Sequence, residues 1–108
     1  MTEHNDILDA LYQVVLERKH NPSEKSYVAS LYAKGLDKIL GKIGEEATEV
    51  AVAGKGGVAG EVISEVADLW FHTLVLLSYY ELPPQRIYAE LERRFGTSGL
   101  VEKAGRTR

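Results

Sequence analysis

The sequence predicts an all-α protein of about five helices, with a four-helix-bundle-like core that is completed by homodimerisation. Apolar residues recur every three or four positions over most of the chain, Gly and Pro interrupt that pattern, and no segment shows the alternation of a strand. At 108 residues, 44% apolar and 27% charged, the chain has the size and balance of one globular domain. We expect the domain to cover residues 1–96 and its C-terminal tail to cover residues 97–108.

Local sequence signals set the bounds of each predicted helix. The predicted helices cover residues 7–20, 27–34, 36–53, 58–80 and 85–95. Candidate N-caps are Asn5-Asp6 and Ser26. The expected breaks are Asn21-Pro22-Ser23, Gly35, Gly54-Lys55-Gly56-Gly57, Pro83-Pro84 and Gly96.

The predicted fourth helix is apolar over much of its circumference in its second half. Its expected buried face consists of Val62, Val66, Leu69, Trp70, Thr73, Leu77 and Tyr80. We assign Trp70 to the core or to a dimer contact. Because so small a chain cannot cover this helix on every side, we expect a homodimer that buries the third and fourth helices.

Composition and charge exclude several classes of protein. The formal charge of −3 and the lack of a basic patch, apart from a short basic tail, argue against nucleic-acid binding. No segment approaches the ~20 uninterrupted apolar residues of a membrane span, and the first residues do not resemble a secretory signal. There is no cysteine, hence no disulfide and no thiolate metal site. A cytoplasmic location is the expectation.

Two acidic motifs lie in helix-periodic sequence. The first is Glu45-Glu46-Ala47-Thr48-Glu49, and the second is Glu65-Val66-Ala67-Asp68. On a helical wheel the first motif shares a sector of roughly 100° with Lys38 and Lys42. The second shares a sector of roughly 60° with Glu61 and His72. Since a short turn joins the two helices, they are expected to be antiparallel neighbours whose acidic faces oppose each other.

Opposed carboxylates favour a magnesium site, because Mg²⁺ takes oxygen ligands from a few carboxylates, water and substrate phosphates. Lys38 and Lys42, with Lys55 in the glycine-rich turn, are candidate phosphate contacts. The alternative is a solvated helix face, on which Lys42 and Glu46 merely pair with each other. His72 extends the acidic row, and we assign it a structural role, since a lone histidine beside a core is usually structural.

The motif Glu-Glu-x-x-Glu followed by Glu-x-x-Asp resembles that of the all-α, MazG-type nucleotide pyrophosphohydrolase superfamily. Further segments are similar to its phosphoribosyl-ATP pyrophosphohydrolase family, which acts in histidine biosynthesis. These segments are Ser26-Tyr27 with Leu31 and Gly35, Lys38 to Val50, Glu65 to Leu69, Leu91 to Phe95, Gly96 to Gly99, and Glu102-Lys103. The resemblance covers nearly the whole chain and corresponds to the family's stand-alone form.

The resemblance implies a set of functional residues and a reaction. The superfamily's magnesium ligands match Glu46, Glu49, Glu65 and Asp68. Glu45 matches the first acid of the motif, which would bind a second metal or orient water. The implied reaction is Mg²⁺-dependent hydrolysis of phosphoribosyl-ATP to phosphoribosyl-AMP and pyrophosphate. Two alternatives stay open: a housecleaning nucleoside triphosphate pyrophosphohydrolase, and a non-catalytic helical adaptor.

Overall fold

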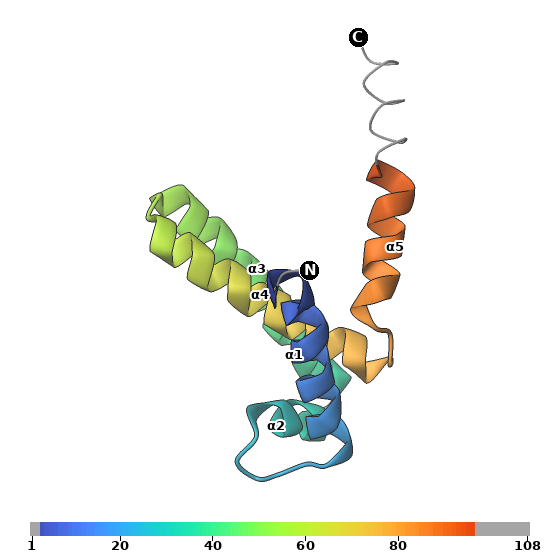
Figure 1. The fold of residues 1–108 in the computed structure, drawn as a ribbon. Helices are drawn as coiled ribbons and strands as arrows, with labels where there is room; N and C mark the ends of the chain where they lie inside the picture. The colour runs from blue at the N-terminus through green and yellow to red at the C-terminus, as the bar shows by residue number, and fades with distance from the viewer. Residues whose placement is uncertain (1–2, 97–108) are drawn as a thin grey trace.

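The computed structural model describes residues 3–96, and all regular structure in that range is helical (Figure 1). The helices are α1 (Glu3–His20), α2 (Tyr27–Lys34), α3 (Leu36–Gly56), α4 (Ala59–Tyr79) and α5 (Pro84–Phe95). The prediction of an all-α chain with five helices is therefore confirmed. The predicted tail, residues 97–108, lies outside the described residues, as do its motif positions Gly99, Glu102 and Lys103.

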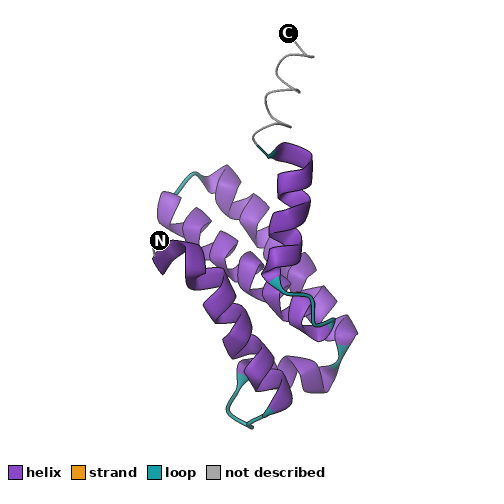
Figure 2. Ribbon diagram, turned by 45° about the vertical axis from the view of Figure 1, so that its right-hand side comes forward, coloured by secondary structure: helices purple, strands orange, loops and turns teal. Residues whose placement is uncertain are grey.

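An antiparallel hairpin of α3 and α4 forms the long body of the molecule. Its turn projects beyond α1 and α2, which cover the opposite half of the hairpin (Figures 1 and 2). In Figure 1, α5 stands apart from the hairpin, and a hydrogen bond from the Tyr88 hydroxyl to Asp9 Oδ1 (3.3 Å) links it to α1. The hairpin thus carries the two acidic motifs on neighbouring helices, one on α3 and one on α4.

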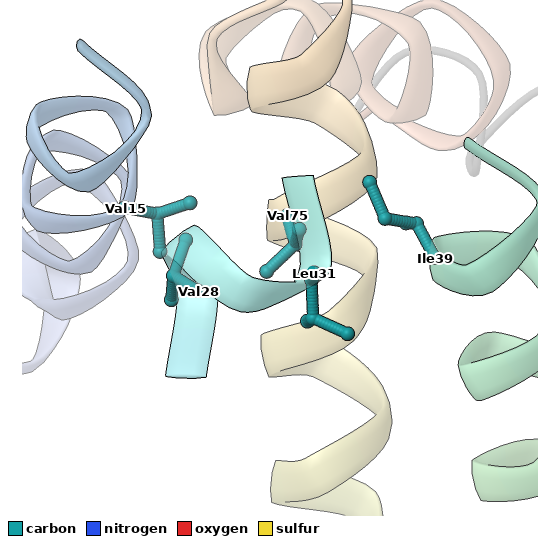
Figure 3. Packing of buried hydrophobic residues seen from close by; sticks show 5 residues of the cluster. All are labelled: Val15, Val28, Leu31, Ile39 and Val75. Atoms are coloured by element: carbon teal, nitrogen blue, oxygen red, sulfur yellow. The ribbon is translucent and has the colours of Figure 1, made fainter. Parts of the chain in front are cut away.

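The core lies where α1, α2, α3 and α4 meet. Its buried cluster is Val15, Val28, Leu31, Ile39 and Val75 (Figure 3). Each of these helices contributes an apolar residue to it, so burial of these side chains fixes α1 and α2 against the base of the hairpin.

The first two helices differ in how well the sequence located their starts. Ser26 caps α2 as predicted, since its hydroxyl oxygen accepts a hydrogen bond from the backbone N–H of Ala29 (3.1 Å). The prediction that the first helix begins after Asn5-Asp6 is wrong, because α1 already begins at Glu3. Neither Gly nor Pro interrupts the segment, and acidic residues are favourable in a first helical turn.

The predicted end of the third helix is also wrong. Gly54, Lys55 and Gly56 continue α3, which ends at Gly57 in the left-handed conformation, with φ of 77°. A glycine inside a helix costs only about 1 kcal/mol relative to alanine, which the rest of this long helix readily tolerates. The left-handed residue is the one position of the glycine run where glycine is structurally needed.

The face of α4 that this chain buries differs from the predicted one. His72, Leu74, Val75 and Ser78 are buried, whereas Trp70 is 55% exposed, so its assignment to the core of this chain is wrong. Part of the predicted apolar face instead lines an open cleft of about 410 Å³ among α1, α4 and α5, namely Leu69, Trp70, Thr73 and Leu77. In its second half, α4 has apolar residues on most of its sides, so periodicity does not show which side the rest of the chain covers. That choice depends on packing against distant segments.

Hydropathy alone would allow α4 to cross a membrane, with a mean of 1.2 over its most apolar stretch. Two features of the fold oppose that reading. The helix carries Glu61, Glu65 and Asp68 in one row, and it packs against both α1 and α3. These features are those of a partly covered core helix.

Candidate metal and active site

Three carboxylates from the two halves of the hairpin converge. One oxygen each of Glu46, Glu49 and Glu65 lies within 4.8 Å of the other two. Glu46 and Glu49 are three residues apart on α3 and therefore share a face, and the antiparallel course of α4 brings Glu65 opposite them. Three of the four predicted metal ligands are thus placed together by local helix geometry and one turn.

The burial and bonding of the cluster suit a positive charge. Glu46 is only 6% exposed, which is unusual for a glutamate. Among the described residues, the buried side-chain atoms without a hydrogen-bond partner are Glu46 Oε1 and Glu65 Oε1. A buried carboxylate oxygen without a partner is costly unless a cation or donor binds it. Two such oxygens in a group of hard oxygen donors fit a divalent cation such as Mg²⁺.

The acidic neighbours of Glu65 affect the pKa of its carboxyl. A hydrogen bond with Glu49 is the main reason why the pKa of the Glu65 carboxyl is raised. Burial and the negative charges of Glu49, Asp68 and Glu46 raise this pKa further. Without a cation, the protein therefore reduces the repulsion by holding a proton more tightly at Glu65.

Asp68 and Glu45, the other two predicted acids of the motifs, lie beside this cluster. Asp68 is exposed, is one turn beyond Glu65 on α4, and its charge acts on the Glu65 carboxyl. Glu45 is exposed and accepts a hydrogen bond from Lys42 Nζ (3.2 Å). Lys42 Nζ also lies 3.7 Å from Glu46 Oε2, so this lysine borders the cluster directly. The bond with Glu45 is the main reason why the pKa of Lys42 is raised, which keeps its positive charge in place.

The two remaining predicted phosphate contacts lie on α3, one before and one after the acidic motif. Lys38 is exposed, one turn before Lys42 on the same helix. Lys55 is exposed in the last turn of α3, at the projecting end of the hairpin. The structure therefore brings Lys42 to the carboxylates and leaves Lys38 and Lys55 at the two sides of the site.

A hydrogen-bonded pair next to the acids was missed by sequence reasoning. The Tyr27 hydroxyl lies 2.8 Å from His72 Nε2, and His72 Nδ1 lies 2.8 Å from the backbone oxygen of Asp68. His72 is buried, as a structural histidine would be, but its partner on α2 lies 45 residues away in sequence. No local spacing pattern connects the two positions; in the sequence, Tyr27 stood out only as part of the Ser26-Tyr27 segment, which carries part of the family resemblance.

The chain is all-helical, and its carboxylates face each other across a helical hairpin. This is the architecture that the acidic motif predicted, that of the all-α nucleotide pyrophosphohydrolases. Comparison with protein families narrows this class. The family model described as phosphoribosyl-ATP pyrophosphohydrolase matches residues 8–95. The chain belongs to the phosphoribosyl-ATP pyrophosphohydrolase family.

Close relatives agree with this placement along the full length of the chain. A phosphoribosyl-ATP pyrophosphatase of Geotalea daltonii is 65% identical, over 97% of this chain and 99% of the relative. A phosphoribosyl-ATP pyrophosphatase of Pelobacter propionicus is 63% identical, over 99% of each chain. A third, from Geobacter metallireducens, is 62% identical over 98% of this chain and 97% of its own.

Proposed function

We propose that this protein hydrolyses phosphoribosyl-ATP to phosphoribosyl-AMP and pyrophosphate, the second step of histidine biosynthesis. The convergence of Glu46, Glu49 and Glu65 within 4.8 Å, in a member of this family, carries the proposal. The full-length match to relatives named phosphoribosyl-ATP pyrophosphatases supports this substrate over other nucleotides.

The residues that would hold Mg²⁺ are Glu46, Glu49, Glu65 and Asp68. Glu46 and Glu65 each offer a buried oxygen that has no partner within the described part of the chain, and Asp68 stands one turn from Glu65. Bound Mg²⁺ supplies charge neutralisation on the polyphosphate and on the leaving pyrophosphate. In a chain of net charge −3, an acidic cluster would otherwise repel such a substrate.

The remaining candidate residues act on the substrate and on water. Lys42, which borders the cluster, would bind a phosphate oxygen, and Lys38 and Lys55 would bind further phosphate oxygens from the two sides. Glu45 is exposed beside Lys42 and would accept a proton from the attacking water. The water would attack the α-phosphorus and pass a proton to Glu45, while the bond from this phosphorus to the oxygen that bridges to the β-phosphorus breaks and pyrophosphate leaves.

Pyrophosphate release from phosphoribosyl-ATP and from a panel of nucleoside triphosphates, with Mg²⁺ and with EDTA, tests the function. We expect phosphoribosyl-ATP to be the preferred substrate and EDTA to abolish turnover. Preference for dCTP or dUTP would instead indicate a housecleaning enzyme. Absence of turnover and of saturable Mg²⁺ binding would indicate the adaptor.

The functional unit is proposed to be a cytoplasmic homodimer that binds neither nucleic acid nor membrane. The apolar cleft beside Trp70, Ile87 and Leu91 supports a second copy of this chain, since each of these side chains is at least 43% exposed. Light scattering of the wild type and of Trp70→Glu tests this proposal. We expect twice the monomer mass for the wild type and a lower mass for the variant.

A further inference from the structure

The Tyr27–His72 pair ties α2 to α4 one turn beyond Asp68. His72 follows Asp68 by four residues and therefore lies on the same side of α4. Tyr27 occupies the first turn of α2, whose start is fixed by the Ser26 cap. Its ring packs against Phe71, with centroids 6.3 Å apart, and against His72 at 5.7 Å. The phenol is thus held by ring contacts and by a hydrogen bond.

The bonding of His72 determines the role of the phenol. A carbonyl oxygen only accepts, so His72 Nδ1 carries the hydrogen that is donated to the backbone oxygen of Asp68. In the neutral imidazole, Nε2 is then an acceptor, and the Tyr27 hydroxyl donates to it. Because the phenol proton is donated to His72, the phenol oxygen can only accept a hydrogen bond from any other group.

The surroundings of Tyr27 place its ring at the protein surface, near charged residues of both acidic motifs. Its side chain is 48% exposed although its hydroxyl is bonded. Burial is the main reason why the pKa of Tyr27 is raised; Lys42 lowers it, and Glu46, Glu45 and Asp68 raise it. The phenol therefore lies within electrostatic reach of both acidic motifs.

We propose that Tyr27, oriented by His72, contacts the bound substrate complex by accepting a hydrogen bond from an O–H donor. Phosphate oxygens without a proton are also acceptors, so they cannot donate a hydrogen bond to the Tyr27 oxygen. The matching donors are a ribose hydroxyl of the nucleotide and the attacking water. His72 is a positioning residue, because it acts through the phenol and contacts no substrate. This inference rests on the proposed function of the acidic site.

Kinetics of Tyr27→Phe at pH 8 test the contact, with Tyr32→Phe as the matched control. Tyr32 also links α2 to α4, through a hydrogen bond to the Ser78 hydroxyl, which in turn donates to the Val75 backbone oxygen. We expect about a tenfold loss of kcat/KM in Tyr27→Phe, as for loss of one hydrogen bond, and less than a twofold loss in Tyr32→Phe. A rise in KM identifies a ribose hydroxyl as the donor, and a fall in kcat identifies the water.

The outcomes separate the inference from the proposed function. A wild type inactive on phosphoribosyl-ATP contradicts the function, and the same variants are then compared on whichever triphosphate it hydrolyses. If no nucleotide is hydrolysed, both fail. An active wild type whose Tyr27→Phe variant loses no more than Tyr32→Phe overturns the inference alone.

The positioning role of His72 has its own readouts. The double variant Tyr27→Phe/His72→Gln should lose no more kcat/KM than Tyr27→Phe, because His72 acts only through the phenol. Additive losses would contradict this role. In the wild type, ¹⁵N spectra should show His72 with its hydrogen on Nδ1. A hydrogen on Nε2 would remove the basis of the inference without need of any variant.

Discussion

Addition of Mg²⁺ should strongly raise the melting temperature of the protein, and loss of Glu49 should suppress that effect. Glu49 is one of three carboxylates with oxygens within 4.8 Å, and it is exposed, so Glu49→Gln changes the site and leaves the core intact. The variant should also melt higher than the wild type in EDTA, because it removes one of three crowded negative charges. Relative to the wild type, the variant should therefore melt lower with Mg²⁺ and higher without it.

The size of the effect follows from linkage. At a free Mg²⁺ concentration about 100 times Kd, binding to the folded state adds about 2.7 kcal/mol. For a domain of this size, that corresponds to a rise of about 10–20 °C. If removal of Glu49 raises Kd about a hundredfold, the same Mg²⁺ concentration gives about 0.4 kcal/mol, or about 2–3 °C.

Differential scanning fluorimetry across a Mg²⁺ titration measures both shifts. Glu61→Gln is the control, since Glu61 is exposed on the same row of α4 and lies outside the three-carboxylate cluster. It should keep the wild-type shift. Equal shifts for the wild type and Glu49→Gln, or a lower melting temperature of Glu49→Gln in EDTA, would refute the reasoning.

Three further predictions concern the fold. In thermal melts, Gly54→Ala should stabilise α3 by up to about 1 kcal/mol, since nothing lies within 4 Å of the added methyl, whereas Gly57→Ala should destabilise by about 1–2 kcal/mol at φ of 77°; effects of the same sign would contradict the observed end of α3. Burial, and then the charge of Tyr12, raise the pKa of Tyr32 to about 12, above its ordinary 10.0, so its contribution to stability is complete below pH 10 and is lost as the pH rises toward 12. In urea unfolding, Tyr32→Phe should therefore lose less stability than the wild type between pH 10 and pH 12. The same loss of stability in both proteins would contradict this prediction. Leu31→Ala, at a position 1% exposed, should cost about 2–5 kcal/mol in urea unfolding, and a cost below 1 kcal/mol would show that the core lies elsewhere.

The sequence predicted those parts of the site that depend on local geometry. Glu46 and Glu49 share a face because they are three residues apart on one helix, and a two-residue connection brings Glu65 opposite them. The motif therefore contained enough information to place three carboxylates together. The roles of these residues, and those of Asp68 and Glu45, stay predictions.

Two features that the sequence did not locate depend on packing between distant segments. Trp70 belongs to an apolar face that hydropathy cannot distinguish from the face buried by α1 and α2. The contact of Tyr27 with His72 joins residues of two helices that no sequence period relates. At the hairpin turn, the intrinsic preference of Gly54 against helix, about 1 kcal/mol, was outweighed by the rest of the long helix α3. The first two features need the three-dimensional arrangement, whereas the end of α3 is a local balance of helix preferences.

The central claim is that Glu46, Glu49 and Glu65, joined by Asp68, hold a divalent cation. Anomalous diffraction from a crystal soaked in Mn²⁺, a stand-in for Mg²⁺ with the same preference for oxygen, tests it most directly. We expect a peak between α3 and α4, about 2.1 Å from carboxylate oxygens of these residues, and its loss in Glu65→Gln. A peak only at another place, or the absence of any peak at saturating Mn²⁺, would contradict the claim.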